Sequence, residues 1–516
     1  MSEPTGVLLG SDHSSAAQVA RRAELLAAVL AAGDHGPSGT VVLAAWNSFL
    51  PLEVSPAVAA AGLRVVLFNP KATASELAYV LADSGARLVI GHADVLRRLG
   101  EGIGSDVTVV AARTPEAVAA VRSDADATVS PPPGAVDYEE FLARGATLPA
   151  PPPGESALSA LFYTSGTTGR PKGVVRPAPT PAEVRRRREV TDTCYGVTAE
   201  SRGLLTTPMH HMFGSNFALT LLRRERPLVI MPRWDAEEML ALVERHRITN
   251  LTMVPTMFAR LLALPERVRA GYDTSSLRHV LHTAAPCPPH VKRAMIEWWG
   301  PILWEQYGTS ETGVVTLCDS AEWLAHPGTV GRPFLGSVVR VYDDEGRECA
   351  PGEAGTVYAR MPGTPDFTYL GRPDDRAAVE RDGLVTGGDI GMLDADGYLH
   401  MRDRRADLVL VSGVNVYPAE VEAQVARFPG IADSVVFGVP DEDLGERVEA
   451  VVALLPQAPA DTVERLREFL RSELSGYKVP RAFHVVDAVS RDESGKVRRH
   501  AVRAAYAGRH GAGGAG

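Results

Sequence analysis

Short apolar runs alternate with amphipathic segments over the first part of the chain. Runs with the length of buried strands cover Thr40–Ala45, Arg64–Phe68 and Ala86–Ile90. Apolar residues at helical spacing predict helices over Ala17–Leu30 and Ala74–Ala82. Thr73 and Glu76 give the second helix a capping-box pattern at its start. Because strands that alternate with helices are typical of βα units, the pattern predicts an α/β fold with a mostly parallel sheet.

The alternation resumes after a proline-rich stretch at 149–154. Asp235 and Glu238 mark the start of one further helix, and Trp298 lies on the core-facing side of another. From about Ser337 the apolar runs become shorter and strand-like, with turn signals between them. These runs cover Ser337–Tyr342, Gly355–Ala359 and Tyr398–Met401.

A last segment follows the charged cluster Asp403–Asp407. It contains strand-like runs at Ser434–Val439 and Val448–Leu455 and a helical pattern at Asp461–Leu474. We therefore expect a large N-terminal domain over residues 1–402, made of mostly parallel sheets with flanking helices plus a β-subdomain. A small α+β C-terminal domain is expected over residues 408–516.

Composition narrows the class of protein. The 516 residues are 45% hydrophobic and 22% charged, which excludes wholesale disorder and suggests several folded domains. The net charge of −10 disfavours a nucleic-acid partner, and the run Arg185–Arg188 is expected to be a solvated helix face. The four cysteines have no CxxC spacing, and neither a signal peptide nor a membrane-spanning run is visible. These features predict a cytoplasmic protein with no membrane span.

The most informative stretch is 163–174, which reads Tyr-Thr-Ser-Gly-Thr-Thr-Gly-Arg-Pro-Lys-Gly-Val. Small residues with free backbone N–H groups, several hydroxyls and a lysine together form an anion cradle. A Walker A loop does not fit, because Pro171 stands where the motif needs glycine and Gly173 stands where it needs Ser or Thr. The loop is therefore predicted to hold phosphate by another arrangement.

Further short motifs follow this loop in a fixed order. They are Pro208–Gly214, Thr283–Pro286, Gln306–Glu311, Thr386–Asp389, Asp403–Arg404, Ser412–Pro418 and Ser494–Lys496. Together with the loop they resemble the superfamily of adenylate-forming enzymes, which includes acyl-CoA synthetases, luciferases and peptide-synthetase adenylation domains. The resemblance covers roughly residues 40–505 and implies a C-terminal domain that moves about a hinge at 403–407.

The resemblance implies ATP, Mg²⁺ and the co-substrate CoA as ligands. The β- and γ-phosphates are assigned to Thr164, Ser165, Gly166, Thr167, Thr168, Gly169 and Lys172. Ala284, Ala285 and Pro286 would line the adenine pocket and Tyr307 would stack on the base, and Gln306 and Gly308 are assigned to nucleotide binding. Thr309 would lie near the α-phosphate, Glu311 would bind Mg²⁺, and Asp389 would accept the ribose hydroxyls.

Other assignments concern catalysis and the acceptor. Arg404 would contact ribose and phosphate, and Lys496 would bridge the substrate carboxylate and the α-phosphate. By the resemblance, His210 would lie at the mouth of the acyl pocket, and it is assigned to catalysis together with Lys496, Lys172 and Thr309. The adjacent histidines are a poor metal site. The channel for the CoA thiol is assigned to Ser412, Gly413 and Tyr417.

Several alternatives stay open. Gly388, Ala406 and Val411 depart from the family pattern at positions that bear on domain rotation and on the thiol channel. The acyl group could therefore pass to a carrier protein or to another nucleophile, or only one half-reaction could be retained. The substrate is expected to be a bulky, apolar carboxylic acid, because His282–Cys287 and Trp298–Pro301 resemble synthetases for such acids. A homodimer is compatible with the resemblance.

Overall fold

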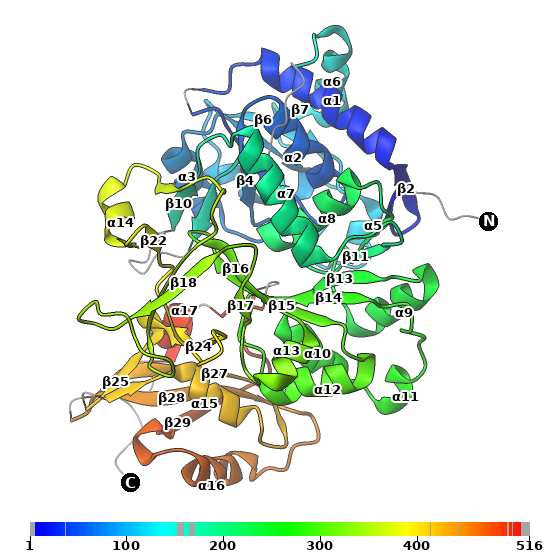
Figure 1. Ribbon diagram of the computed structural model, residues 1–516. Coiled ribbons are helices and arrows are strands. Elements are labelled where there is room, and N and C mark those ends of the chain that lie inside the picture. Colours follow the sequence, from blue (N-terminus) through cyan, green and yellow to red (C-terminus); the bar gives the residue numbers. More distant parts are fainter. Residues whose placement is uncertain are drawn as a thin grey trace.

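The protein is described by a computed structural model that covers residues 6–36, 38–151, 159–164, 171–412, 414–441, 443–492, 495–497 and 499–506. Figure 1 shows the blue, cyan and green elements of the N-terminal part as a large upper body. The orange and red elements, which follow residue 408, gather at its lower end. None of the helices in these ranges is long and apolar enough to cross a membrane.

A parallel sheet forms the first unit. Its strand order is β7 (Val136–Asp137), β6 (Thr108–Ala112), β5 (Leu88–His92), β3 (Thr40–Ala44), β4 (Arg64–Phe68) and β8 (Ser159–Ala160). Each neighbouring pair runs parallel. β3 is buried along its whole length, as expected for a strand that is covered on both faces.

A second, larger sheet supplies the edge on which the candidate site lies. Its strand order is β17 (Arg332–Pro333), β16 (Gly313–Cys318), β15 (Leu303–Thr309), β14 (His279–His282), β13 (Asn250–Met253), β11 (Gly203–Leu205), β12 (Leu228–Ile230), β1 (Gly6–Leu9) and β2 (Asp12–Ser15). The strands from β15 to β1 are parallel, and the outer strands are antiparallel.

Helices cover these two sheets. They are α1 (Ala16–Ala32), α2 (Leu50–Ala60), α3 (Ala74–Ser84), α4 (Ala93–Leu99), α5 (Glu116–Ala119), α6 (Tyr138–Ala143), α7 (Pro181–Tyr195), α8 (Met212–Arg223), α9 (Ala236–His246), α10 (Pro255–Leu262), α11 (Glu266–Arg269), α12 (Pro289–Trp299) and α13 (Ser320–Ala325). Short 3₁₀ turns occupy Gly100–Gly102, Arg144–Thr147, Arg405–Asp407 and Gly476–Lys478.

Antiparallel strands form the β-subdomain. They are β18 (Val338–Tyr342), β19 (Gly355–Arg360), β21 (Glu380–Arg381), β22 (Leu384–Val385), β23 (Asp389–Leu393) and β24 (Leu399–Arg404). A small sheet beside them joins β9 (Phe162–Thr164), β10 (Lys172–Val175) and β20 (Thr368–Tyr369), and α14 (Pro373–Ala378) follows β20. The small sheet brings the strand that starts at Lys172 next to a segment almost two hundred positions later in the chain.

The C-terminal part has its own mixed sheet. Its elements are β25 (Val409–Val411), β26 (Val414–Val416), α15 (Pro418–Val425), β27 (Ile431–Asp441), β28 (Gly445–Leu454), α16 (Thr462–Glu473), β29 (Ala482–Val486) and α17 (Arg499–Tyr506). The strand order is β26-β25-β28-β27, and β29 pairs with β28 in parallel. A separate hydrophobic cluster, which includes Val421, Val436 and Leu466, fills this unit.

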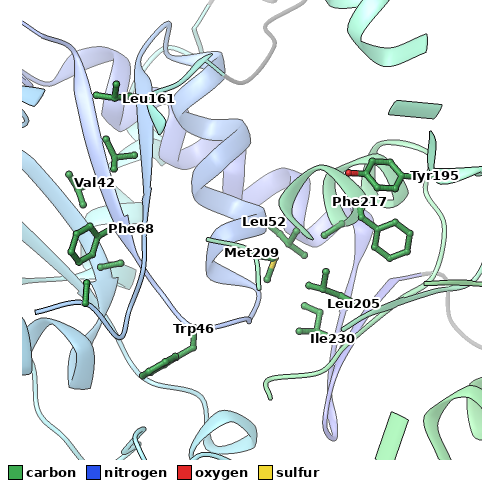
Figure 2. Close-up of a cluster of buried hydrophobic side chains, with 14 of the residues drawn as sticks. Val42, Trp46, Leu52, Phe68, Leu161, Tyr195, Leu205, Met209, Phe217 and Ile230 are labelled. Atoms are coloured by element: carbon green, nitrogen blue, oxygen red, sulfur yellow. The ribbon is translucent and has the colours of Figure 1, made fainter. Parts of the chain in front are cut away.

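One hydrophobic cluster joins the two large sheets, as Figure 2 shows. Val42 and Phe68 come from the first sheet, and Leu205 and Ile230 come from the second. Phe217 of α8 packs among them. Since burying one such side chain stabilises a fold by about 1.5–3 kcal/mol, this shared core holds the two sheets in one fixed arrangement.

The structure confirms the predicted fold class and most elements. The capping box of Thr73 and Glu76 is formed, and Asp235 caps α9 by accepting from two backbone N–H groups. The strand predicted at Ala86–Ile90 is β5, which begins and ends two residues later than predicted.

The prediction that Arg185–Arg188 is a solvated helix face is wrong for most of the run. Arg185 is exposed, whereas the next three arginines of α7 are half-buried. The side chain of Arg186 donates to the carbonyl oxygens of Leu335 and Pro362, and burial lowers the pKa of Arg187. A charge pattern along a helix does not reveal that a distant loop covers it.

Candidate active site

The carboxyl ends of β13, β14 and β15 meet at one edge of the large sheet. These strands are parallel neighbours, with Met253 opposite His282 and His282 opposite Glu305. The residues that follow them are therefore brought together, although they lie far apart in the chain. Ligand sites of open α/β sheets lie at such edges.

The segment assigned to adenine has an unusual backbone. Ala284 is exposed and has a φ of +83°, a left-handed conformation that is uncommon for a residue with a Cβ. The Thr283 hydroxyl donates to the carbonyl oxygen of Gln306 at 2.8 Å, which ties this segment to β15. The side-chain Oε1 of Gln306 is buried and has no hydrogen-bond partner among the described residues. An unsatisfied buried acceptor fits a ligand that brings an N–H donor, as adenine does.

A buried ion pair joins α12 to β15. The Nζ of Lys292 on α12 lies 2.6 Å from an Oε of Glu305 on β15, and both side chains are almost fully buried. His282 on β14 is buried beside them, and burial lowers its pKa, so its ring is neutral. Removing one partner of such a pair costs about 3–5 kcal/mol, so the pair fixes α12 against β15.

Asp389 lies at the start of β23 and is 6% exposed. The Tyr307 hydroxyl donates to its Oδ2 at 2.8 Å, and the Arg404 Nε donates to its Oδ1 at 3.1 Å. Burial and the neighbouring carboxylate raise the pKa of Tyr307, so its hydroxyl keeps its proton. Three residues from separate motifs thus form one polar cluster, which suits recognition of a ribose.

A tight turn connects β15 to Glu311. The Oγ1 of Thr309 accepts hydrogen bonds from the backbone N–H groups of Glu311 and Thr312, at 3.2 and 3.1 Å. A Cβ at Gly308 would lie 2.0 Å from the carbonyl oxygen of Gly313, so this position admits only glycine. Glu311 is 9% exposed, and its Oε1 accepts from the Tyr369 hydroxyl at 3.0 Å. A single carboxylate suits Mg²⁺, which takes its other ligands from phosphate and water.

Lys172 begins β10 and faces α14. Its Nζ lies 2.9 Å from an Oδ of Asp375 and 5.2 Å from the centre of the Tyr369 ring. The remaining residues predicted for the phosphate loop, Ser165, Gly166, Thr167, Thr168 and Gly169, lie outside the described residues, as does the side chain of Thr164.

Lys496 reaches the same region from the C-terminal part. Its side chain is exposed, and its backbone N–H donates to Asp492 Oδ1 at 2.9 Å. Although solvent reaches Lys496, the protein packed around it and the charge of Arg404 lower its pKa, whereas the carboxylates of Asp389 and Glu311 act in the opposite direction. The neighbouring Gly495 approaches α10 so closely that a Cβ there would lie 2.8 Å from the Thr256 Oγ1.

The segment 403–407, which was predicted to be a hinge, contacts the C-terminal part. The Asp403 carboxylate accepts from the backbone N–H of Ala419 at 2.8 Å, and burial raises the pKa of Asp403 to about 6. Arg499 lies 3.0 Å from Asp407 and 3.7 Å from Asp403. Gly413 and the side chain of Ala406 lie outside the described residues.

The remaining predicted residues lie on other segments of the chain. Ser412 is exposed with a φ of +49°, and Tyr417 caps α15 without a side-chain hydrogen bond. The rings of His210 and His211 lie 4.4 Å apart at the start of α8. Burial and the charge of His211 lower the pKa of His210, so it is a neutral imidazole.

Charges or hydrogen bonds thus link seven predicted residues into one region: Lys172, Tyr307, Thr309, Glu311, Asp389, Arg404 and Lys496. Sequence reasoning missed Tyr369, Arg176 and Asp375, which contact these residues. It also missed Lys292, whose signal was a lysine on the apolar face of a predicted helix.

Comparison with known proteins agrees with this geometry. A family model described as "AMP-binding enzyme" matches residues 7–365, and one described as "AMP-binding enzyme C-terminal domain" matches residues 420–496. A feruloyl-CoA synthase from Amycolatopsis sp is 32% identical over 97% of this chain and 95% of its own length.

Two further matches differ in the reaction that their names describe. A 3-[(3aS,4S,7aS)-7a-methyl-1,5-dioxo-octahydro-1H-inden-4-yl]propanoyl:CoA ligase from Rhodococcus jostii is 31% identical over 97% of this chain and 95% of its own length. The structure of the amide bond synthetase McbA from Marinactinospora thermotolerans superposes with a TM-score of 0.81 at 26% identity, covering 97% of this chain and 96% of that one.

Proposed function

Because the chain belongs to the family of AMP-binding, adenylate-forming enzymes, we propose that it is an ATP-dependent acyl-CoA synthetase. In the first step, a carboxylate oxygen of the acid attacks the α-phosphorus of ATP. The bond to the β-phosphate oxygen breaks, pyrophosphate leaves, and an acyl-adenylate forms. In the second step, the CoA thiolate attacks the acyl carbon, the bond to the AMP oxygen breaks, and AMP leaves.

Each proposed role follows from charge and position. Lys172 neutralises charge on the leaving pyrophosphate, and Thr309 lies near the α-phosphate. Asp389 accepts hydrogen bonds from the ribose hydroxyls once Tyr307 or Arg404 no longer donates to one of its carboxylate oxygens. Tyr307 stacks on the base. Glu311 would hold Mg²⁺, which when bound neutralises phosphate charge. Lys496 holds the carboxylate and the α-phosphate at attack distance, although the two repel each other.

The observation that carries this proposal is the close approach of the Lys496 loop to the N-terminal part, where a Cβ at Gly495 would lie 2.8 Å from the Thr256 Oγ1 and the carboxylates of Asp389 and Glu311 act on the charge of Lys496. Lys496 comes from the C-terminal part, whereas the two carboxylates come from the N-terminal part. A cation delivered to this point suits the adenylation step. We propose that residues 403–407 form the hinge between domains 1–402 and 408–516, and that rotation about it exposes the channel of Ser412, Gly413 and Tyr417 to the thiol.

We propose a bulky, apolar acid as the substrate. The proposal draws support from the relatives named for feruloyl-CoA and for a bicyclic propanoyl-CoA. His210 at the start of α8 is proposed to line the pocket mouth as a neutral imidazole, which avoids placing a charge beside an apolar chain.

A second candidate differs in the acceptor. The likeness to an amide bond synthetase favours transfer of the acyl group to an amine. The departures at Gly388, Ala406 and Val411 bear on domain rotation and on the thiol channel, and both candidates begin with an acyl-adenylate. Both candidates therefore share the first step.

The experiment measures pyrophosphate release from ATP with a panel of straight-chain, aryl and ring-bearing acids, with and without EDTA. We expect release that depends on one class of acid and on a divalent cation. CoA, a primary amine and an acyl carrier protein are then offered as acceptors. Absence of acid-dependent pyrophosphate release with every acid would contradict the proposal, and product with amine alone would select the second candidate.

A further inference from the structure

Tyr369 lies between the two groups that are proposed to act on the phosphates of ATP. It stands on β20, which pairs with β10 so that Tyr369 is opposite Val174. This pairing fixes the Tyr369 ring beside the start of β10, where the Lys172 Nζ lies 5.2 Å from the ring centre. The face of the ring attracts the ammonium group.

The other end of the same side chain contacts Glu311. The Tyr369 hydroxyl donates to the Glu311 Oε1 at 3.0 Å, and both side chains are buried, with 6% and 9% of the residue exposed. A hydrogen bond to a buried carboxylate is stronger than one between neutral groups, because water competes for it less. The bond therefore restricts the direction in which the carboxylate points.

Arg176, which directly follows β10, holds the main chain of Glu311. Its Nη2 donates to the carbonyl oxygens of Ser310 and Glu311, each at 2.9 Å, and its Nη1 donates to the Pro365 carbonyl. The backbone position of Glu311 is thus fixed from β10, and the orientation of its carboxylate is fixed from β20. The small sheet therefore fixes the position of Lys172, which is proposed to bind phosphate, relative to Glu311, which is proposed to bind the metal ion.

We propose that Tyr369 is a positioning residue that orients the Glu311 carboxylate toward the divalent cation and aligns it with Lys172. This inference rests on the proposed function, in which Glu311 is the carboxylate that binds Mg²⁺. Tyr369 acts through Glu311 and Lys172 and does not itself touch the reacting atoms. Partners that orient a metal ligand in this way typically change metal affinity about 10–100-fold when they are removed.

The test measures Mn²⁺ binding by electron paramagnetic resonance, with the full chain and an ATP analogue that has a methylene group between its α- and β-phosphates. Tyr369→Phe keeps the ring beside Lys172 and removes only the hydroxyl. We expect its Mn²⁺ dissociation constant to rise about 10-fold. The affinity for the analogue without metal should stay within about 2-fold of wild type, because the cation–π contact remains.

Two further variants separate the contacts of the ring. Tyr369→Leu also removes the aromatic face, so metal-free binding of the analogue should weaken by about 2- to 5-fold as well. Tyr342→Phe is the matched control, because Tyr342 is a buried tyrosine of the β-subdomain whose hydroxyl donates to Asp382 at 2.9 Å. We expect Mn²⁺ binding by this control to equal that of wild type. Thermal unfolding of each variant checks that the fold is intact.

Glu311→Gln distinguishes failure of this inference from failure of the proposed function. If Glu311→Gln binds Mn²⁺ like wild type, the metal assignment itself is wrong. If Glu311→Gln loses Mn²⁺ affinity but Tyr369→Phe does not, the metal site stands and the positioning role of Tyr369 is overturned. Equal weakening of metal-free and metal-dependent binding in Tyr369→Phe would also overturn it, because that result would indicate general displacement of the site.

Discussion

Glu311 and Lys496 contribute charges to the same proposed nucleotide site, but the protein holds them in different ways. Glu311 is 9% exposed, and Tyr369 and Arg176 fix it from a neighbouring sheet of the N-terminal part. Lys496 is exposed in a loop, and the contacts of its backbone run to Asp492 within the C-terminal part.

The geometry around Glu311 is therefore set within the N-terminal part, whereas the position of Lys496 depends on how the two parts are placed. The orientation of Glu311 is set by contacts that remain whenever the N-terminal part is folded. The position of Lys496 depends on the approach of Gly495 to Thr256 and on the contacts of Arg499 with Asp403 and Asp407 in the proposed hinge. Rotation of the C-terminal part would remove Lys496 and leave Glu311 in place.

The largest effect is expected for Lys496→Ala. Loss of the cation should slow acyl-adenylate formation by about 10²–10⁴-fold, because the charge acts on two anions that must meet in the transition state. Pyrophosphate release in single-turnover experiments measures it. Lys478→Ala is a matched control, since Lys478 lies in the same C-terminal part and pairs with Glu420 at 2.7 Å. A similar loss of adenylation rate in the control would show that the effect does not depend on the charge of Lys496 in particular.

Lys172→Ala should slow adenylation by about 10²-fold, because the lysine neutralises charge on the leaving pyrophosphate. An acyl-adenylate lacks the β- and γ-phosphates, so its dissociation constant should change little. The two quantities are measured by pyrophosphate release and by calorimetry with a synthetic adenylate. Comparable losses in both would contradict the assignment of Lys172 to the phosphates.

Asp389→Ala should weaken ATP and acyl-adenylate by about the same factor, since both contain the ribose. A charge-assisted contact of this kind is worth about 1.5–3 kcal/mol, which corresponds to roughly 10- to 150-fold in affinity. Titration with each ligand measures the two dissociation constants. Unchanged ATP affinity would make Asp389 a structural partner of Tyr307 and Arg404 only.

The smallest effect is expected for Asp375→Asn. The ion pair between Lys172 and Asp375 must open before Lys172 can bind phosphate, and partly exposed pairs are worth about 0.2–1 kcal/mol. Removing the carboxylate should therefore tighten ATP binding by about 1.5- to 5-fold. Weaker binding would mean that Asp375 supports the site instead of competing with the phosphates.

The sequence predicted the class of the fold but not the order of the strands in its sheets. Local signals placed helices and strands well, as the capping box of α3 and the buried run of β4 illustrate. Ordered motifs also led to Tyr307, Asp389 and Arg404, which the structure joins by hydrogen bonds.

Contacts between distant segments could not be predicted from local patterns. Tyr369 meets Glu311 and Lys172 because β20 pairs with β10, and no periodicity encodes which strands pair. Lys292 stands among apolar helix positions, and only the packing of β15 against α12 reveals Glu305 as its partner. The burial of Arg187 likewise depends on what covers α7.

The most direct measurement compares both half-reactions in one pair of proteins. Wild type and Lys496→Ala are assayed for pyrophosphate release from ATP and, separately, for thioester formation from a synthetic acyl-adenylate and CoA. We predict that the variant loses the first activity by at least about 10²-fold and keeps the second near the wild-type rate, because Lys496 acts only while its loop faces the nucleotide. Equal damage to both activities would contradict the claim that placement of the C-terminal part separates the two steps.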